Sequence, residues 1–234
     1  MKFTKLMVED RVNTFREQII KRTGIPIEEI EVVEESFNYL ASKHYTIMST
    51  SIGKIFVDPK KNHDSSVNLE RIVLHELGHR AGDVLSPNRH EMIMTCLSGI
   101  NNPVHKKIGF IDKVFGLSKV IVEGNLFVPR IIDEGIAEFF GLDVFSDVCD
   151  LKKDTKIAID NIKWDHLCLV NPDNIQSRGY NFFVPILTSY SPLRNMVNYL
   201  TNFSSAQVPR KRDFANSESY WIGQGIKYNG KCGI

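Results

Sequence analysis

The stretch LHELGHRAGD, residues 74–83, contains two histidines four positions apart, with a glutamate directly after the first. One turn of an α-helix takes 3.6 residues, so His75 and His79 are expected to project from the same face. Glu76 is expected about 100° further around the helix, beside that face. Two imidazoles at this spacing can bind one metal ion, and the adjacent carboxylate can accept a proton from water that the metal activates. The stretch therefore predicts a helix that carries half of a catalytic metal site.

The residues around this stretch predict a helix over positions 67–81. Ser66 is a typical N-cap residue, and Gly82 stands where a left-handed C-terminal cap is expected. Apolar residues recur every four positions along the segment, which predicts a buried ridge on another face from the histidines. The ridge consists of Leu69, Val73 and Leu77.

A small antiparallel β-sheet is predicted between an N-terminal helix and this metal-binding helix. Apolar residues at helical spacing predict the first helix over residues 9–21, ending near Gly24. Three short runs follow that are rich in β-branched residues and alternate in hydropathy. They are IEVV, HYTIMSTS and KIFVDP, at residues 30–33, 44–51 and 54–59. Residues 52–53 are expected to join the last two runs as a hairpin.

The C-terminal half is predicted to be mostly helical. IIDEGIAEFFGL, residues 131–142, predicts a second well-defined helix, and residues 179–200 predict two more that are broken near Pro192. The fold class is therefore α+β, in a single catalytic domain spanning residues 1–234. We expect an N-terminal lobe of about residues 1–125, a C-terminal lobe of about 126–234, and a metal cleft between them.

Composition excludes several classes of function. The chain has 234 residues, 42% hydrophobic and 24% charged, as in ordinary globular proteins. Lys and Arg number 29 against 28 Asp and Glu. The chain therefore lacks the excess of positive charge that would favour binding to nucleic acid or to an anionic membrane. No run of about 18 apolar residues predicts a membrane span, and the N-terminus does not resemble a signal peptide. The four cysteines form no CxxC pair, so we expect free thiols and a cytoplasmic location. Nothing in the sequence predicts an oligomeric state.

A catalytic zinc site needs a third protein ligand besides the two histidines. The metzincin pattern HExxHxxGxxH would place it at position 85, where the chain has Leu85, so that class is excluded. The other residues with suitable donors are Asp83, His90, His105, His166 and Glu134. Glu134 is the best candidate, because it is the one that a recognisable helix orients.

Glu134 and Glu138 lie four residues apart on that predicted helix, so both can face the same site. One carboxylate can bind the metal while the other accepts a hydrogen bond from the second N–H group of a ligand histidine. Gly135 and Ala137 are small, which would allow this helix to approach the first one closely. Together the two helices predict a complete metal site.

HELGH followed downstream by PRIIDEGIAEFF resembles the gluzincin metallopeptidases, the clan that includes thermolysin and the zinc aminopeptidases. Their second motif is often written P-x-W-x-x-E-G-x-A-E-[YF]. The matching residues here are Pro129, Glu134, Gly135, Ala137, Glu138 and Phe139, with Ile131 where the tryptophan often stands. The resemblance covers about residues 54–142, with a weaker similarity at 179–200. The 54 residues between His79 and Glu134 form a longer gap than in the aminopeptidases, so we expect an insertion that builds a cleft wall or a lid.

The resemblance implies a zinc-dependent peptidase that acts on a peptide or protein substrate. It implies that His75, His79 and Glu134 bind Zn²⁺, that Glu76 is the general base, and that Glu138 supports a ligand histidine. It also implies that KIFVDP is a strand at the cleft edge that pairs with the substrate backbone. The GxMEN motif of the aminopeptidases is absent, which favours an endopeptidase.

Gluzincins often supply a second donor to the developing oxyanion from the C-terminal lobe. Tyr180 is the first candidate, because RGYNFFVPIL resembles the helix that follows the glutamate ligand in the family. The remaining candidates are Tyr190, His166 and Tyr199.

Two alternatives to a general endopeptidase remain open. One is a regulatory protease with a single dedicated protein substrate. The other is a zinc-binding module that is catalytically silent, or whose C-terminal tail, residues 217–234, inhibits it. The sequence of that tail predicts no element of secondary structure.

Overall fold

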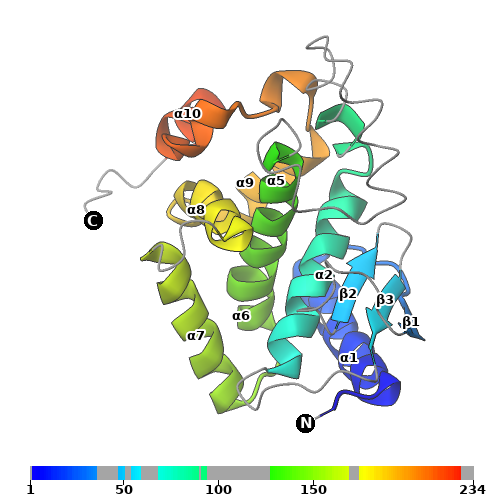
Figure 1. The fold of residues 1–234 in the computed structure, drawn as a ribbon. Coiled ribbons are helices and arrows are strands. Elements are labelled where there is room, and N and C mark those ends of the chain that lie inside the picture. Colours follow the sequence, from blue (N-terminus) through cyan, green and yellow to red (C-terminus); the bar gives the residue numbers. More distant parts are fainter. Residues whose placement is uncertain are drawn as a thin grey trace.

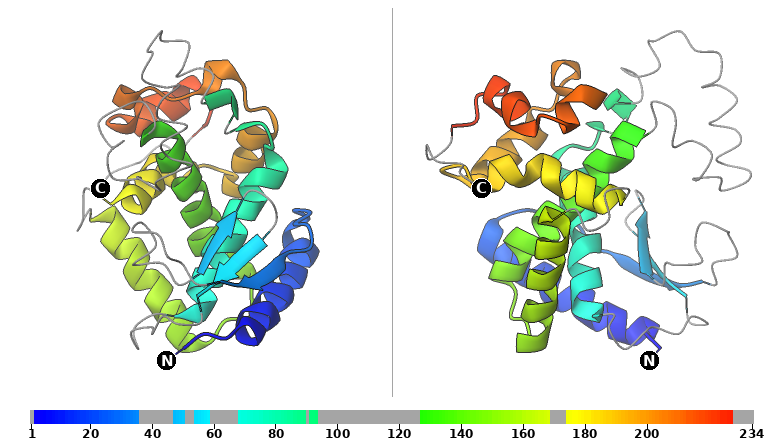
Figure 2. Two further views of the ribbon diagram at one scale, coloured as in Figure 1. Left: turned by 45° about the vertical axis from the view of Figure 1, so that its right-hand side comes forward. Right: turned by 60° about the vertical axis from the view of Figure 1, so that its left-hand side comes forward.

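The computed structural model describes residues 2–35, 47–50, 54–58, 68–89, 91–93, 127–168 and 174–227. The fold is α+β and mostly helical (Figure 1). The long helix α2 (Leu69–Leu85) lies between a small β-sheet on one side and a group of helices from the C-terminal half on the other (Figures 1 and 2). None of the described helices is long and apolar enough to cross a membrane.

The first helix, α1 (Lys5–Thr23), forms as the hydropathy pattern predicts, and is longer by a turn at its N-terminus. The Thr4 side chain caps that end by accepting a hydrogen bond from the Met7 amide. Gly24 ends the helix in the left-handed conformation, with φ = 75°, and its N–H group donates to the carbonyl of Ile20. The prediction of a helix that ends near Gly24 is confirmed.

The sheet contains β1 (Glu31–Glu34), β2 (Ile47–Thr50) and β3 (Lys54–Val57), in the order β1-β3-β2. The hairpin pairing of β2 with β3 is antiparallel, as expected, but β1 pairs with β3 in parallel. The prediction of an all-antiparallel sheet is therefore wrong. Because β3 is paired on both sides, the prediction that KIFVDP lies at an edge is also wrong. Among the described strands, the edges are β1 and β2.

Helix α2 begins and ends later than its sequence predicts. Its N-cap is Asn68, whose side chain accepts a hydrogen bond from the Arg71 amide, and Ser66 lies outside the described residues. At the other end the helix continues through Gly82 to Leu85. A side chain at Gly82 would lie 2.8 Å from the methyl group of Ile136, so this glycine provides space for α5 and does not cap α2.

The second motif forms helix α5 (Phe127–Glu138), which continues into a π-helical segment (Phe139–Phe145) and the short helix α6 (Ser146–Val148). Such π-helical turns are uncommon and are found frequently at functional sites. The helices α7 (Lys153–Leu167), α8 (Ile175–Leu187) and α9 (Pro192–Thr201) follow. Helix α9 begins at Pro192, where the sequence predicts a break between two helices.

The last described elements are two 3₁₀ turns (Ser205–Gln207 and Lys211–Phe214) and the helix α10 (Ser217–Gly223). Helix α10 packs against α8, and its Trp221 is fully buried and donates a hydrogen bond to the carbonyl of Phe182 at 2.6 Å. The described part of the tail is therefore anchored on α8 by an indole ring.

Close contacts through small residues hold α5 between α2 and α8. A Cβ atom at Gly78 of α2 would lie 2.4 Å from the backbone oxygen of Ala137. On the other side, a Cβ atom at Gly135 would lie 2.5 Å from the backbone oxygen of Gly179 on α8. The expected close approach through Ala137 is confirmed, whereas Gly135 faces α8 and not α2.

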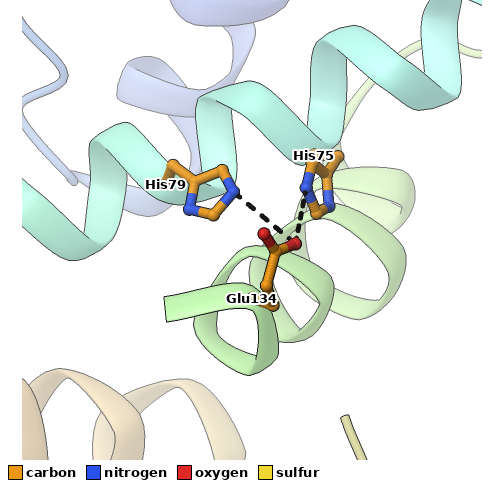
Figure 3. Close-up of side chains that lie close together, drawn as sticks. All are labelled: His75, His79 and Glu134. Atoms are coloured by element: carbon orange, nitrogen blue, oxygen red, sulfur yellow. Dashed lines mark ion pairs between the residues drawn. The ribbon is translucent and has the colours of Figure 1, made fainter. Parts of the chain in front are cut away.

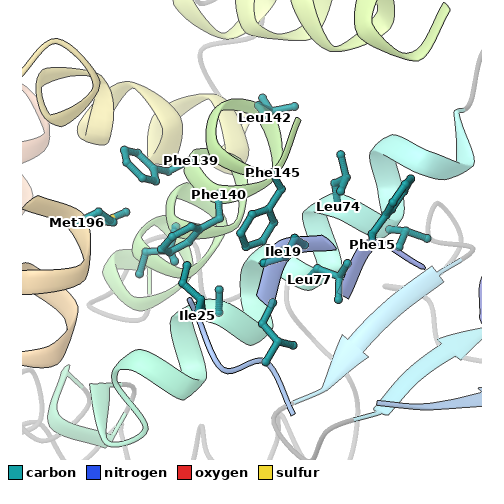
Figure 4. Close-up of a cluster of buried hydrophobic side chains, with 14 of the residues drawn as sticks. Phe15, Ile19, Ile25, Leu74, Leu77, Phe139, Phe140, Leu142, Phe145 and Met196 are labelled. Carbon is teal, nitrogen blue, oxygen red and sulfur yellow. The ribbon is translucent and has the colours of Figure 1, made fainter. Parts of the chain in front are cut away.

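One continuous cluster of buried apolar side chains joins the N-terminal and C-terminal halves. Phe15 and Ile19 of α1 meet Leu74 of α2, and Phe140 and Phe145 of the π-helical segment complete this part of the core (Figure 4). The face of α2 opposite the histidines is thus held by α1 and by the segment after α5. The division into two lobes stays a prediction.

Candidate metal centre

Three side chains from two helices converge on one point (Figure 3). The Nε2 atom of His75 lies 3.4 Å from Oε2 of Glu134, and Nε2 of His79 lies 4.0 Å from the same oxygen. One donor atom from each residue can be chosen so that all three lie within 4.8 Å of one another. The structure therefore brings together the three residues that the sequence predicts as metal ligands.

The helix packing explains this convergence. His75 and His79 lie on successive turns of α2 with ring centroids 4.8 Å apart, and Gly78 lies between them. Because Gly78 lets the backbone of Ala137 approach α2, the side chain of Glu134 one turn earlier on α5 can reach both imidazoles. Spacing along α2 pairs the histidines, and the glycine contact brings the carboxylate to them.

His75 has a second carboxylate at its other ring nitrogen. Its Nδ1 atom lies 3.0 Å from Oε1 of Glu138, which is fully buried. Nη2 of Arg71 donates a hydrogen bond to the same oxygen at 3.1 Å. Histidines that bind metals commonly direct their second nitrogen to such a carboxylate, which fixes the orientation of the ring. The structure thus places Glu138 where the sequence predicts a supporting residue.

The charges of these groups are strongly coupled. Burial alone would lower the pKa of His75, but the carboxylates of Glu138 and Glu134 outweigh it and raise the pKa to about 10. Burial would raise the pKa of Glu134, but His75 and His79 outweigh it and lower the pKa to about 2. A cation that binds this cluster must therefore displace a proton from His75.

Glu138 stays ionised although it is completely buried. Burial raises the pKa of a carboxyl group, but the neighbouring His75, Arg71 and His166 more than compensate, and they hold the pKa of Glu138 well below its usual range. Glu138 is thus a fixed negative charge behind the candidate site.

Glu76 is the predicted general base. It follows His75 directly on α2 and is buried, with 7% of its surface exposed. It therefore lies in the same helical turn as His75 and about one turn before His79. Its role as a base stays a prediction.

Tyr180 does not join the three ligands. It lies on α8 with 2% of its surface exposed, and its ring centroid is 5.4 Å from that of His166. Its hydroxyl group interacts with the carboxylate of Asp143, and burial together with this carboxylate raises the pKa of the phenol. The proposed role of Tyr180 as oxyanion donor stays a prediction, without support from the contacts of its hydroxyl group.

Most of the other candidate donors and ligands have partners outside the group of His75, His79 and Glu134. Tyr199 is buried, with its hydroxyl group 3.4 Å from that of Tyr220, and Tyr190 is exposed. Asp83, an alternative ligand, lies 3.0 Å from Nη1 of Arg80. His166 faces Glu138 and not the three ligands, and His90 and His105 lie outside the described residues.

Two residues at the site are absent from the sequence predictions. Arg71 lies one turn before His75 on α2, so its i, i+4 spacing could have identified it. Gln176 lies in the first turn of α8 and donates a hydrogen bond from Nε2 to Oε2 of Glu134 at 3.3 Å. No sequence pattern connects Gln176 with Glu134, because their contact depends on how α8 crosses α5.

A buried arginine ties the start of the predicted insertion to α5. Arg89 donates from Nη2 to Asp133 at 2.9 Å and from Nη1 to the carbonyl of Gly82 at 2.7 Å. Asp133 directly precedes Glu134, so this contact helps to fix the ligand helix. The part of the insertion from residue 94 to 126 lies outside the described residues, as do residues 228–234 of the tail.

Comparisons with known proteins do not extend this assignment: no protein-family model, curated protein or solved structure matches the chain.

Proposed function

We propose that the chain is a zinc-dependent metallopeptidase of the gluzincin type that cleaves internal peptide bonds of a peptide or protein substrate. One observation supports this most strongly. His75 and His79 of α2 converge with Glu134 of α5, while a separate buried carboxylate, that of Glu138, lies against the far nitrogen of His75.

The donor set fits zinc. In a tetrahedral zinc site with bonds of about 2.0–2.1 Å, neighbouring ligand atoms lie about 3.3 Å apart. The 3.4 Å between Nε2 of His75 and Oε2 of Glu134 matches this separation, whereas the 4.0 Å between Nε2 of His79 and the same oxygen would have to shorten by about 0.7 Å when the ion binds. Three protein ligands, two of them imidazoles, are also the set found in catalytic sites, which keep a further position for water or substrate.

A zinc ion bound by these residues would supply Lewis-acid chemistry, lowering the pKa of water toward about 7 and polarising a substrate carbonyl. Glu76 would accept the proton from that water and return it to the leaving amine. Glu138 and Arg71 would keep the ring of His75 in its binding orientation, and Gln176 would hold the carboxylate of Glu134 by its hydrogen bond.

The sheet suggests where the substrate would bind. A peptide that pairs with a strand needs a strand edge, and β3 has none because both its sides are occupied. Strand β2 is an edge of the described sheet and also contacts α2. We therefore assign backbone pairing with the substrate to β2 instead of to KIFVDP.

The test is cleavage of a diverse library of quenched peptides by the wild type and by Glu76→Gln. Glu76→Gln keeps the three ligands, so it should bind zinc as the wild type does. It should cleave at least about 100-fold more slowly, because it lacks the general base. Removal of zinc with a chelator should abolish cleavage by the wild type, and added zinc should restore it.

Two results would contradict the proposal. If both proteins cleaved equally well, Glu76 would not be the base. If neither cleaved although both bound zinc, a general endopeptidase would be excluded, and the metal centre would serve one dedicated substrate or a binding role.

A further inference from the structure

Behind Glu138 lies a histidine that neither motif includes. His166, near the end of α7, is buried with 5% of its surface exposed. Its Nε2 atom lies 3.7 Å from Oε2 of Glu138. Its Nδ1 atom lies 2.8 Å from the hydroxyl oxygen of Ser177, and its carbonyl accepts a hydrogen bond from Nδ2 of Asn181 at 2.6 Å. Helix α8 thus holds both the ring and the backbone of His166.

The contact with Ser177 determines what His166 can offer to Glu138. A neutral imidazole has one N–H donor and one acceptor nitrogen, whereas a serine hydroxyl can donate its hydrogen. If the Ser177 hydroxyl donates to Nδ1 of His166, the proton of the ring lies on Nε2. An ionised carboxylate only accepts hydrogen bonds, so Nε2–H is the form that suits Glu138.

The two oxygens of Glu138 have different surroundings. Oε1 lies close to His75 and Arg71, at 3.0 and 3.1 Å. Oε2 lies 3.7 Å from Nε2 of His166, and neither atom has a hydrogen-bond partner among the described residues. A buried carboxylate is costly unless its oxygens are paired, and His166 is the donor that the structure directs at Oε2.

We propose that His166 is a positioning residue of the metal centre. Its Nε2–H group restrains Oε2 of Glu138, and the restrained carboxylate in turn fixes the ring of His75. The relevance of this chain of contacts to catalysis rests on the proposed function, whereas its effect on metal binding does not require peptidase activity. This chain of contacts connects Ser177 of α8 and His166 of α7 to His75 of α2 through the buried carboxylate of Glu138.

The experiment compares three variants of the full chain. His166→Leu removes both ring nitrogens, whereas His166→Gln keeps an N–H donor near the position of Nε2. Ile159→Ala is the matched control, since Ile159 lies on the same helix and is buried in the core with 1% of its surface exposed. The measurements are zinc affinity by chelator competition, the visible spectrum of the Co²⁺-substituted protein, and the thermal unfolding of the metal-free protein.

His166→Leu should weaken zinc binding by about 10-fold, the lower end of the effect of losing a direct outer partner, and should change the Co²⁺ spectrum. His166→Gln should recover most of the affinity. Ile159→Ala should lower the unfolding temperature and leave the affinity and the spectrum unchanged. If His166→Leu lowered only the unfolding temperature, as Ile159→Ala does, His166 would be merely structural and the proposal would be overturned.

The outcome separates this proposal from the proposed function. A wild type that binds zinc but cleaves no peptide refutes the peptidase, yet the affinities of the variants still decide the role of His166. A wild type that binds no zinc overturns both.

Discussion

Replacing Gly78 by alanine should separate the two halves of the metal centre. A Cβ atom at this position would lie 2.4 Å from the backbone oxygen of Ala137, and 2.9 and 3.0 Å from its Cα and carbonyl carbon. Ordinary van der Waals contact begins at 3.4 Å. All three neighbouring atoms belong to the backbone of α5, so no side-chain rotation can relieve the contact. The helices must move apart by about 1 Å.

The sign of the stability change tests this argument. In a helix interior, alanine is normally more stable than glycine by about 1 kcal/mol, whereas overpacking a close contact costs about 1–3 kcal/mol. Because three backbone atoms are overpacked at once, we expect a cost in the upper part of this range, about 2–3 kcal/mol, so that the free energy of unfolding falls by about 1–2 kcal/mol in total. The distance of 3.4 Å between Nε2 of His75 and Oε2 of Glu134 spans the same interface, so it should increase when the helices move apart. A displacement of this size can cost about 100-fold in catalysis.

The assay is denaturant unfolding of the metal-free protein together with zinc affinity by chelator competition. Gly223→Ala is the matched control, because Gly223 is also helical, on α10, and its added Cβ would meet nothing within 4 Å. The control should be as stable as the wild type or slightly more stable, with unchanged zinc binding. If Gly78→Ala behaved like the control in both measurements, the close packing of α2 on α5 would not hold the metal centre together.

Three further changes test individual groups. Glu138→Gln removes the charge beside His75 and should weaken zinc binding by about 10–100-fold in chelator competition; unchanged affinity would exclude a supporting role. Arg89→Ala removes the buried guanidinium that donates to Asp133 and to the carbonyl of Gly82, and should lower the free energy of unfolding in urea by about 3 kcal/mol; a loss below about 1 kcal/mol would mean that water replaces the guanidinium. Burial raises the pKa of the Cys149 thiol to about 12, so at pH 8 iodoacetamide should label exposed Cys168 far faster, as peptide mass spectrometry can measure. Labelling of Cys149 should increase only as the pH approaches 12 or the protein unfolds, and equal rates at pH 8 would contradict its burial.

The sequence is sufficient to predict which side chains share a helix face at the candidate centre, because that part of the geometry is local. His75 and His79 are fixed on one face by the helix period alone, and the same period places Glu134 and Glu138 together on a second helix. The sequence contains no comparable local rule for the direction of a strand. Alternating hydropathy is the same in parallel and antiparallel strands, so the parallel pairing of β1 with β3 could not be predicted from it.

The two glycines that the sequence predicts as C-caps show again that a local pattern does not reveal contacts between distant segments. Gly24 and Gly82 both follow an apolar helical pattern, which predicts that each of them ends a helix. Only Gly24 adopts a positive φ, while Gly82 lies inside α2 because Ile136 of α5 packs against it. Whether such a glycine ends a helix or makes room for another helix therefore depends on a residue that is distant in the sequence.

Tyr180 illustrates how the crossing of two helices determines what a side chain contacts. Its neighbour Gly179 is pressed against Gly135 of α5, which fixes the rotation of α8. In that orientation the hydroxyl group of Tyr180 meets Asp143, while Gln176, one turn earlier, reaches Glu134. The residue next to the ligand is thus selected by the α5–α8 contact, which no single-sequence pattern reveals.

Because α5 lies between α2 and α8, a movement of this one helix would affect the candidate centre at two points. Glu134 and Glu138 meet opposite ring nitrogens of His75, and both belong to the one helix that glycine contacts hold between α2 and α8. A rigid shift of α5 would therefore disturb the candidate ligand Glu134 and, at the same time, the contact of Glu138 that orients His75. Any contact that fixes α5, including that of Arg89 with Asp133, should influence metal binding without touching the metal. Loss of zinc affinity in Arg89→Ala that exceeds the loss in an equally destabilised variant far from α5 would demonstrate this coupling.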